Sequence, residues 1–201
     1  MSNQGKMDCG RRRLIVATAA VGGSGVLAAL VPFVSTLLPS ERAKAAGAPV
    51  EVDISKLEAG QMITVEWRGK PVWVMRRTKE MLETLATLNS ELADPDSAKA
   101  EQPPYCKGME RTIPNQDPAV LVMVGICTHL GCSPTAKFRA GTEESMPADW
   151  KGGFLCPCHG STFDLSGRVF KNKPAPTNLP VPPYKYLSET RIIIGVDTEG
   201  A

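Results

Sequence analysis

The sequence predicts a mainly β, antiparallel domain with one inserted helix, preceded by a single N-terminal helix long enough to cross a membrane. Residues 14–40 carry no charged side chain over 27 positions. After residue 50, several short apolar runs are separated by turn residues, and only one segment has helical spacing. Many short strands with one helix favour an antiparallel β domain.

The N-terminus combines a basic tail with the uncharged run. Residues 1–13 contain Arg11-Arg12-Arg13, and a spanning helix needs about 20 apolar residues. Basic residues before such a helix hold that end in the cytoplasm. We therefore predict a cytoplasmic tail over 1–13, a transmembrane anchor over 14–40, and a body outside the cytoplasm.

A cleaved signal peptide is the alternative for this segment. Ala43-Lys44-Ala45 has the A-x-A form of a cleavage site, but the apolar part of a signal peptide usually covers about 7 to 15 residues. The longer run here favours a retained anchor. The adjacent arginines also resemble a twin-arginine export signal. Either way the body is exported, to a compartment where neighbouring cysteines can form disulfides.

Residues 41–49 are small, polar and poor in side chains that could pack, so we predict a flexible tether there, followed by a head domain over 50–201. Alternating and β-branched residues predict three strands, with Arg68–Pro71 as the turn between the last two. Their ranges are 50–54, 62–67 and 72–76.

A helix should follow these strands. Thr78 is a suitable cap, and apolar residues then recur at three- and four-residue intervals until Asp94-Pro95. These apolar residues are Met81, Leu82, Leu85, Leu88 and Leu92.

The rest of the head divides into a polar insertion and further strands. Residues 93–118 are rich in proline and polar residues and predict a surface insertion. Residues 119–126 predict a buried strand that ends at Cys127, and residues 184–187 and 191–196 predict a closing hairpin.

Composition excludes two broad classes. The 23 basic and 21 acidic residues give a net charge of +2, and only 5% of residues are aromatic, which argues against nucleic-acid binding. The 42% apolar content argues against disorder over the whole chain.

Two short boxes contain both histidines and four of the six cysteines. They are Cys127-Thr128-His129-Leu130-Gly131-Cys132 and Cys156-Pro157-Cys158-His159-Gly160-Ser161. Thiol and imidazole groups at this spacing predict a metal site, and the glycines allow the loops to wrap closely. Zinc would need four of the six groups, and Cys127, His129, Cys156 and His159 form a near-symmetric set of four.

The boxes resemble those of the Rieske iron–sulfur proteins of the quinol:cytochrome c oxidoreductases, the cytochrome bc1 complexes. The resemblance extends to the anchor, to Lys173-Pro174-Ala175-Pro176 and to Pro182-Pro183-Tyr184. The extra cysteine pair, Cys132 and Cys158, separates this group from the Rieske oxygenases, which usually lack it. The resemblance implies a Rieske-type antiparallel β-sandwich head with a small cluster-binding subdomain at about 125–176.

The resemblance also implies one [2Fe–2S] cluster, with Cys127 and Cys156 on one iron, His129 and His159 on the other, and a Cys132–Cys158 disulfide. Four thiolates would leave the oxidised cluster at −2, whereas two thiolates and two neutral imidazoles leave it at zero. The neutral cluster accepts an electron more easily, and potentials of roughly −150 to +300 mV are known for this class.

The implied function is electron transfer within the respiratory bc1 complex. The cluster would take an electron and a proton from ubiquinol beside cytochrome b, with His159 as acceptor, and would then reduce cytochrome c1. The proton fits a histidine ring nitrogen, which binds a proton more tightly when the metal is reduced. The resemblance further implies a dimeric, proton-translocating complex in the bacterial inner membrane, with the head in the periplasm.

Residues around the cluster have implied roles as well. Ser161 resembles a serine that bonds a cluster sulfide, and Gly131 and Gly160 shape the loops around it. Some relatives have a tyrosine that bonds a ligand thiolate where this chain has Phe163. The residues expected to form an apolar docking tip for quinol and cytochrome are His129, His159, Leu130, Pro174, Ala175 and Pro176.

Other interpretations remain open at this level. The small subunit of an arsenite oxidase has a similar pattern, although the long anchor and the proline segment favour the bc1 assignment. A structural zinc module or an extracellular thiol–disulfide protein is a different class. Cys9 and Cys106 have no assigned role; we expect Cys106 to be inert.

Overall fold

A computed structural model describes residues 9–197 except positions 107 and 142. The chain forms two compact units, one up to Ala45 and one from Ala46 onward.

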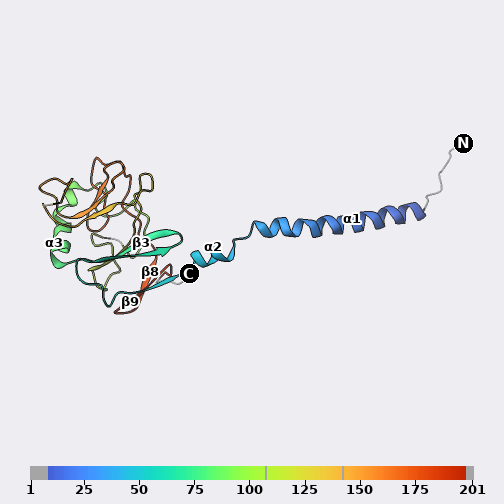
Figure 1. Cartoon of the computed structure of the whole chain (residues 1–201), viewed down its shortest axis with the longest axis horizontal. Coiled ribbons are helices and arrows are strands. Elements are labelled where there is room, and N and C mark those ends of the chain that lie inside the picture. Colours follow the sequence, from blue (N-terminus) through green and yellow to red (C-terminus); the bar gives the residue numbers. More distant parts are fainter. Residues whose placement is uncertain (1–8, 107, 142, 198–201) are drawn as a thin grey trace. The chain divides into compact units, whose positions relative to one another are not determined.

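The first unit is dominated by the apolar helix α1 (Cys9–Thr36), drawn as one continuous helix in Figure 1. Its 28 residues rise about 42 Å, more than the roughly 30 Å of a bilayer's hydrocarbon core. The predicted N-terminal apolar helix is therefore confirmed, although it includes Arg11-Arg12-Arg13 and ends four residues before Ser40. By length and composition it can span a membrane.

The segment predicted as a tether contains a short helix, α2 (Glu41–Ala46). The Ser40 hydroxyl accepts the Ala43 N–H at 3.2 Å, and Lys44 pairs with Glu41 at 2.7 Å across one turn. An exposed ion pair of this kind stabilises a helix by only about 0.3–0.5 kcal/mol.

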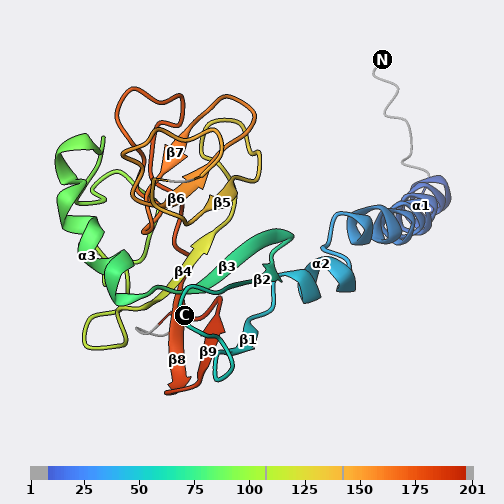
Figure 2. The ribbon, with the colours of Figure 1, turned by 60° about the vertical axis from the view of Figure 1, so that its left-hand side comes forward.

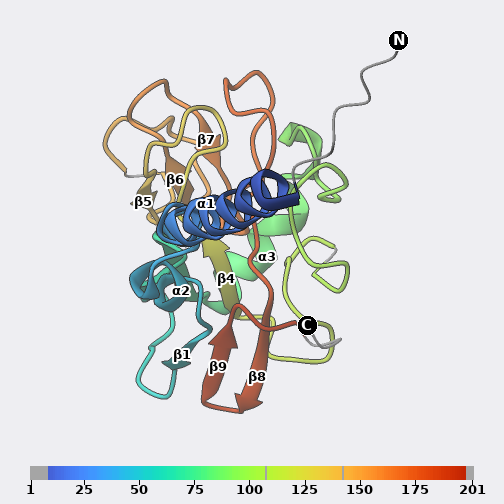
Figure 3. The ribbon, with the colours of Figure 1, turned by 90° about the vertical axis from the view of Figure 1, so that its right-hand side faces the viewer.

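The head contains three antiparallel, three-stranded sheets among its described residues. Their orders are β1-β9-β8, β2-β3-β4 and β5-β6-β7. The strands are β1 (Val50–Asp53), β2 (Met62–Trp67), β3 (Lys70–Arg76), β4 (Val120–Val124), β5 (Thr135–Lys137), β6 (Gly153–Leu155), β7 (Thr162–Phe163), β8 (Tyr184–Ser188) and β9 (Arg191–Ile194). Figures 2 and 3 both show the β5–β7 sheet at one end of the head and the β8–β9 hairpin at the other, with β4 between them. The mainly β fold class is confirmed.

The predicted hairpin of β2 and β3 is present, with a tighter turn than expected. Trp67 pairs with Lys70, so the turn has only Arg68 and Gly69, at φ 52° and 69°. Positive φ at both central residues is the type I′ geometry that matches the twist of antiparallel strands. Pro71 lies in β3, where its carbonyl accepts the Gly125 N–H at 2.9 Å.

The predicted helix is α3 (Lys79–Thr87), and the Thr78 hydroxyl caps it by accepting the Met81 N–H at 3.2 Å. It is shorter than predicted, because a 3₁₀ turn, η1 (Asn89–Glu91), replaces its last residues. Asparagine and serine side chains compete for backbone hydrogen bonds and favour turns. Helix α3 buries Leu85 in the core.

The prediction of a surface insertion over 93–118 is wrong in part. Its described residues form no helix or strand, but Arg111 and Cys106 are fully buried and Ser97 is 3% exposed. Burial raises the pKa of the Cys106 thiol to about 12, so this cysteine is neutral and inert at neutral pH.

The core between the β2-β3-β4 sheet and the metal boxes depends on a close approach. Trp73 of β3 stacks on Phe154 of β6 with ring centroids 5.0 Å apart. A Cβ at Gly125 would lie 2.2 Å from the Trp73 ring, so only glycine fits beside it. The same core cluster contains Cys127 and Cys156, which fastens both boxes to the sheets.

Candidate metal centre

The two boxes form loops with the same backbone hydrogen bonds. Cys127 follows β4, accepts the Gly131 N–H at 3.0 Å and donates its own N–H to Cys132 at 2.8 Å. Cys156 follows β6, accepts the Gly160 N–H at 3.0 Å and donates its N–H to Ser161 at 2.7 Å. Each cysteine is therefore the first residue of its loop, and the two loops have equivalent backbone hydrogen bonds.

Glycine is needed at the fourth position after each cysteine. Gly131 and Gly160 have φ values of 86° and 71°, in the left-handed region that most side chains avoid. No atom lies within 4 Å of a Cβ built on either one, so the backbone angle is the reason for glycine here. The predicted role of both glycines in shaping the loops has this physical basis.

The two loop cysteines are side by side and buried. Cys127 and Cys156 are free thiols, each 2% exposed. Burial raises the pKa of the Cys127 thiol and the neighbouring Cys156 raises it further, whereas the His129 N–H and the Ser161 hydroxyl lower it. Two such thiols become thiolates together only when a cation balances them. The site therefore suits a metal cluster.

The histidines lie on the outer side of the same loops. The rings of His129 and His159 are 4.9 Å apart between centroids and meet edge to face. His129 is half-buried and His159 is exposed. They occupy different places in the two loops, the second position after Cys127 and the third after Cys156. The two cysteines of the candidate site are thus buried, whereas His159 is exposed and His129 is half-buried.

A disulfide joins the loops. Cys132 and Cys158 are bonded, with Cα atoms 6.7 Å apart and a sequence separation of 26. The sulfurs of these two residues and of Cys156 all lie within 4.8 Å of one another. Since disulfide sulfurs are not thiolates, this closeness indicates that the bridge packs against Cys156, not a three-cysteine metal site.

The proline segment is tied to both loops. The Ser161 hydroxyl accepts the Ala175 N–H at 3.0 Å, and the Thr128 hydroxyl donates to the Thr177 carbonyl at 2.7 Å. Ser161 is fully buried, and its hydroxyl lowers the pKa of the Cys127 thiol. The role of Thr128 in holding the proline segment was not predicted from the sequence. The position of Thr128 inside the first box was the only available signal.

Four of the six residues of the expected docking tip are exposed, while His129 is half-buried and Ala175 is buried. Leu130 is 71% exposed, and Pro174 and Pro176 are also exposed. Ala175 is 4% exposed, because it turns inward toward Ser161, so its side chain does not contribute to the surface of the tip. Leu130, which follows His129 in the chain, and the two prolines therefore add exposed apolar surface to the loops and to the proline segment.

Comparisons with known proteins agree with this geometry. The Rieske [2Fe-2S] domain family matches residues 49–184, and a family described as the ubiquitinol-cytochrome C reductase Fe-S subunit TAT signal matches residues 1–40. The ubiquinol-cytochrome c reductase iron-sulfur subunit of Allochromatium vinosum is 55% identical over 100% of this chain and 95% of its own. That of Bradyrhizobium diazoefficiens is 45% identical, over 90% of this chain and 92% of its own.

Among solved structures, a chain of a hyperthermophilic respiratory complex III is similar. It is 31% identical, with a TM-score of 0.47, and the match covers 88% of this chain and 96% of that one.

Proposed function

The chain belongs to the Rieske iron–sulfur subunits of the ubiquinol–cytochrome c reductases, and on that premise we propose how its residues perform quinol oxidation. The family carries one Rieske [2Fe–2S] cluster. In our proposal Cys127 and Cys156 hold one iron, and His129 and His159 hold the other. The bound cluster supplies a one-electron acceptor of the class whose potentials lie at roughly −150 to +300 mV.

The exposure of the histidines beside two buried thiols carries this proposal. An electron donor outside the head can approach His159 and His129 but not the sulfur side. His159 would accept the proton of ubiquinol at a ring nitrogen, in a site where Leu130 and the neighbouring prolines exclude water. The proline segment, tied through Ala175 and Thr177, would hold this apolar surface in place.

The rate at which ubiquinol reduces the cluster in membranes tests the role of the tip. A Leu130→Ser variant should lower that rate at least severalfold, because an apolar contact with the quinol pocket is lost, while the cluster's potential stays the same. Leu187→Ser is the matched control, since Leu187 is a 46% exposed leucine on β8. Equal rates in both variants would count against docking through the tip.

The proposed setting is the bacterial inner membrane. The apolar helix and the export signal support a membrane-anchored, exported head. We place the N-terminus in the cytoplasm and the head in the periplasm, because basic residues precede the helix. The proposed partners are cytochrome b, cytochrome c1 and ubiquinol, in a dimeric complex that contributes to proton translocation; the chain alone has no complete activity.

Residues 41–49 would let the head move between cytochrome b and cytochrome c1. Proline at Ala43 and Ala45 should slow quinol–cytochrome c turnover severalfold, because proline fixes φ and restricts the preceding residue. The iron–sulfur signal should not change. Serine at the same two positions is the control, and turnover equal to that control would contradict a need for motion in this segment.

Phe163 offers a test of the cluster's surroundings. It is fully buried in the core cluster that contains Cys127 and Cys156, and no hydroxyl is present there. Phe163→Tyr should raise the midpoint potential by about 60 mV. The added hydroxyl would donate a hydrogen bond to a ligand thiolate, and a bond that favours the reduced cluster about tenfold raises the potential of a one-electron couple by about that amount. Phe154→Tyr, in the strand-paired neighbour, is the control. A redox titration that shows no rise in Phe163→Tyr would count against a thiolate within reach.

A further inference from the structure

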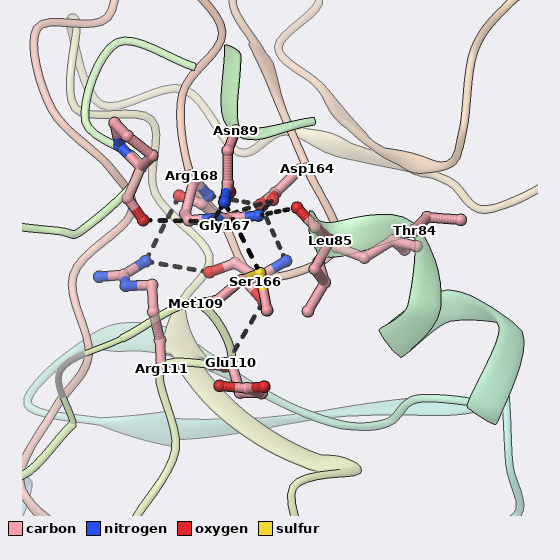
Figure 4. Close-up of polar contacts among 12 residues, drawn as sticks. Thr84, Leu85, Asn89, Met109, Glu110, Arg111, Asp164, Ser166, Gly167 and Arg168 are labelled. Atoms are coloured by element: carbon pink, nitrogen blue, oxygen red, sulfur yellow. Dashed lines mark hydrogen bonds and ion pairs between the residues drawn. The ribbon is translucent and has the colours of Figure 1, made fainter. Parts of the chain in front are cut away.

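Three fully or nearly fully buried arginines converge on one short loop that follows the second metal box in the chain. Arg111 and Arg168 are 0% exposed and Arg77 is 2% exposed. They come from three distant parts of the chain: the end of β3, the irregular segment after η1, and the loop that follows β7. Figure 4 shows Arg111 and Arg168 on either side of Ser166 and Gly167.

The loop runs from Asp164 to Arg168 and is itself buried. Asp164 accepts the backbone N–H groups of Ser166 and Arg168 at 2.9 and 2.7 Å, and its other oxygen accepts the Arg168 guanidinium at 2.8 Å. Arg168 also donates to the Leu85 carbonyl at 2.8 Å and to the Asn89 side chain at 2.9 Å. Arg168 is therefore neutralised by Asp164 and held by neutral oxygens.

Among the described residues, no carboxylate is in direct contact with the other two guanidiniums. Arg111 donates to the carbonyls of Ser166 at 3.0 Å and Leu179 at 2.7 Å, and to the Gln102 side chain. Arg77 donates to the Ser166 hydroxyl and the Pro118 carbonyl. All of these acceptors are neutral.

The buried charges therefore do not cancel. Among the described residues, the charged side chains classed as buried are the three arginines with Asp94 and Asp164, which leaves one positive charge in excess. Asp94 is engaged by the backbone N–H groups of Ala98 and Lys99. Burial lowers the pKa of Arg77 and Arg111 to about 10, so both remain charged at neutral pH.

This charge lies close to the metal boxes along the chain. Only the two residues of β7 separate Ser161, which closes the second box, from Asp164, so their Cα atoms are at most about 11 Å apart. Ser166, which Arg111 and Arg77 contact, is at most about 18 Å from Ser161. A unit charge at about 12 to 18 Å changes a redox equilibrium about five- to tenfold at an effective dielectric constant near 20.

We propose that the buried guanidiniums of Arg77 and Arg111, packed on the Asp164–Arg168 loop, stabilise the reduced cluster electrostatically and thereby raise its midpoint potential. Reduction adds a negative charge to the cluster, and the guanidiniums are already fixed in a region that water does not screen. The inference rests on the bound cluster and not on the identity of the electron donor or partner. It goes beyond quinol oxidation.

An EPR-monitored redox titration of the full chain in membranes measures this effect. Arg111→Met should lower the equilibrium constant for cluster reduction about five- to tenfold, where tenfold corresponds to about 59 mV for one electron. Arg111→Lys retains the charge but not the fork of donors, so it should stay near wild type in potential. Both variants should lose comparable thermal stability, because both lose carbonyl contacts.

Two further variants keep the test decisive. Arg191→Met removes an exposed arginine that pairs with Glu51 on the β1-β9-β8 sheet, and it should leave the potential unchanged. Glu110→Gln removes a half-buried carboxylate whose charge acts on Arg77, so the potential should rise. This variant needs no repacking and remains informative if Arg111→Met does not fold.

The two roles of the arginines give different patterns. An electrostatic role predicts that the potential falls in Arg111→Met but not in Arg111→Lys, and that it rises in Glu110→Gln. Both shifts should persist in high salt. Equal shifts in Arg111→Met and Arg111→Lys, or no change in Glu110→Gln, would overturn the proposal and leave the arginines as purely structural. Quinol oxidation would stand in either case.

Discussion

Replacing Cys127 with serine should remove the iron–sulfur signal, whereas the same change at Cys106 should leave it intact. Both cysteines are buried free thiols, which makes them a matched pair. Only Cys127 lies beside a second thiol and close to the histidine loops. Loss of a partner outside the ligand set typically costs 10- to 100-fold in metal affinity, so loss of a ligand should cost more than about 100-fold.

The measurement is the iron content and EPR signal of membranes, with the amount of folded chain determined in parallel. Quinol–cytochrome c reductase turnover should fall to background in Cys127→Ser and stay near wild type in Cys106→Ser. A cluster retained in Cys127→Ser would refute the proposed ligand set. Loss of the cluster in Cys106→Ser, with normal folding, would show that the second cysteine has a role that the structure does not indicate.

Removal of the Cys132–Cys158 disulfide should have the next largest effect. The bond closes a loop of 26 residues in sequence, for which chain entropy alone predicts a stabilisation of about 3–4 kcal/mol. Both loops are largely exposed around it, and besides the bridge their bases are held by the pairing of Thr135 in β5 with Leu155 in β6. A Cys132→Ser/Cys158→Ser double variant should therefore lose its cluster at a lower temperature than wild type.

The loss can be followed by visible absorption and iron release on heating. Cys9→Ser is the control, because Cys9 lies on α1 and not in the head. The two single variants should resemble the double one, since either change breaks the same bond. Cluster release at the wild-type temperature in the double variant would mean that the hydrogen bonds of the two loops hold the site without the bridge.

The sequence predicted the elements that have a strong local signal. The Thr78 cap, the β2–β3 hairpin and the strand before Cys127 each follow from residues adjacent in the chain. The cysteine and histidine boxes were also readable, because their spacing is itself the signal. Spacing singled out the four candidate ligands, whereas their division between two irons came only from family resemblance.

Other features could not be predicted because they depend on distant contacts. Strands β5, β6 and β7 have three, three and two residues, too few to show an alternating pattern. Arg77, Arg111 and Arg168 are residue types that are rarely buried, and their acceptors lie 55 or more residues away in several cases. Proline and polar content predicted an exposed segment at 93–118. Arg111 in that segment is buried instead, because it donates to the distant carbonyls of Ser166 and Leu179.

A redox titration of the cluster from neutral to alkaline pH, followed by EPR in membranes, tests the central claim most directly. Histidine ligation with joint uptake of one electron and one proton predicts a Rieske-type signal whose midpoint falls with rising pH, approaching about 59 mV per pH unit. A low midpoint that does not change with pH would indicate ligation by thiolates alone and would contradict the roles proposed for His129 and His159.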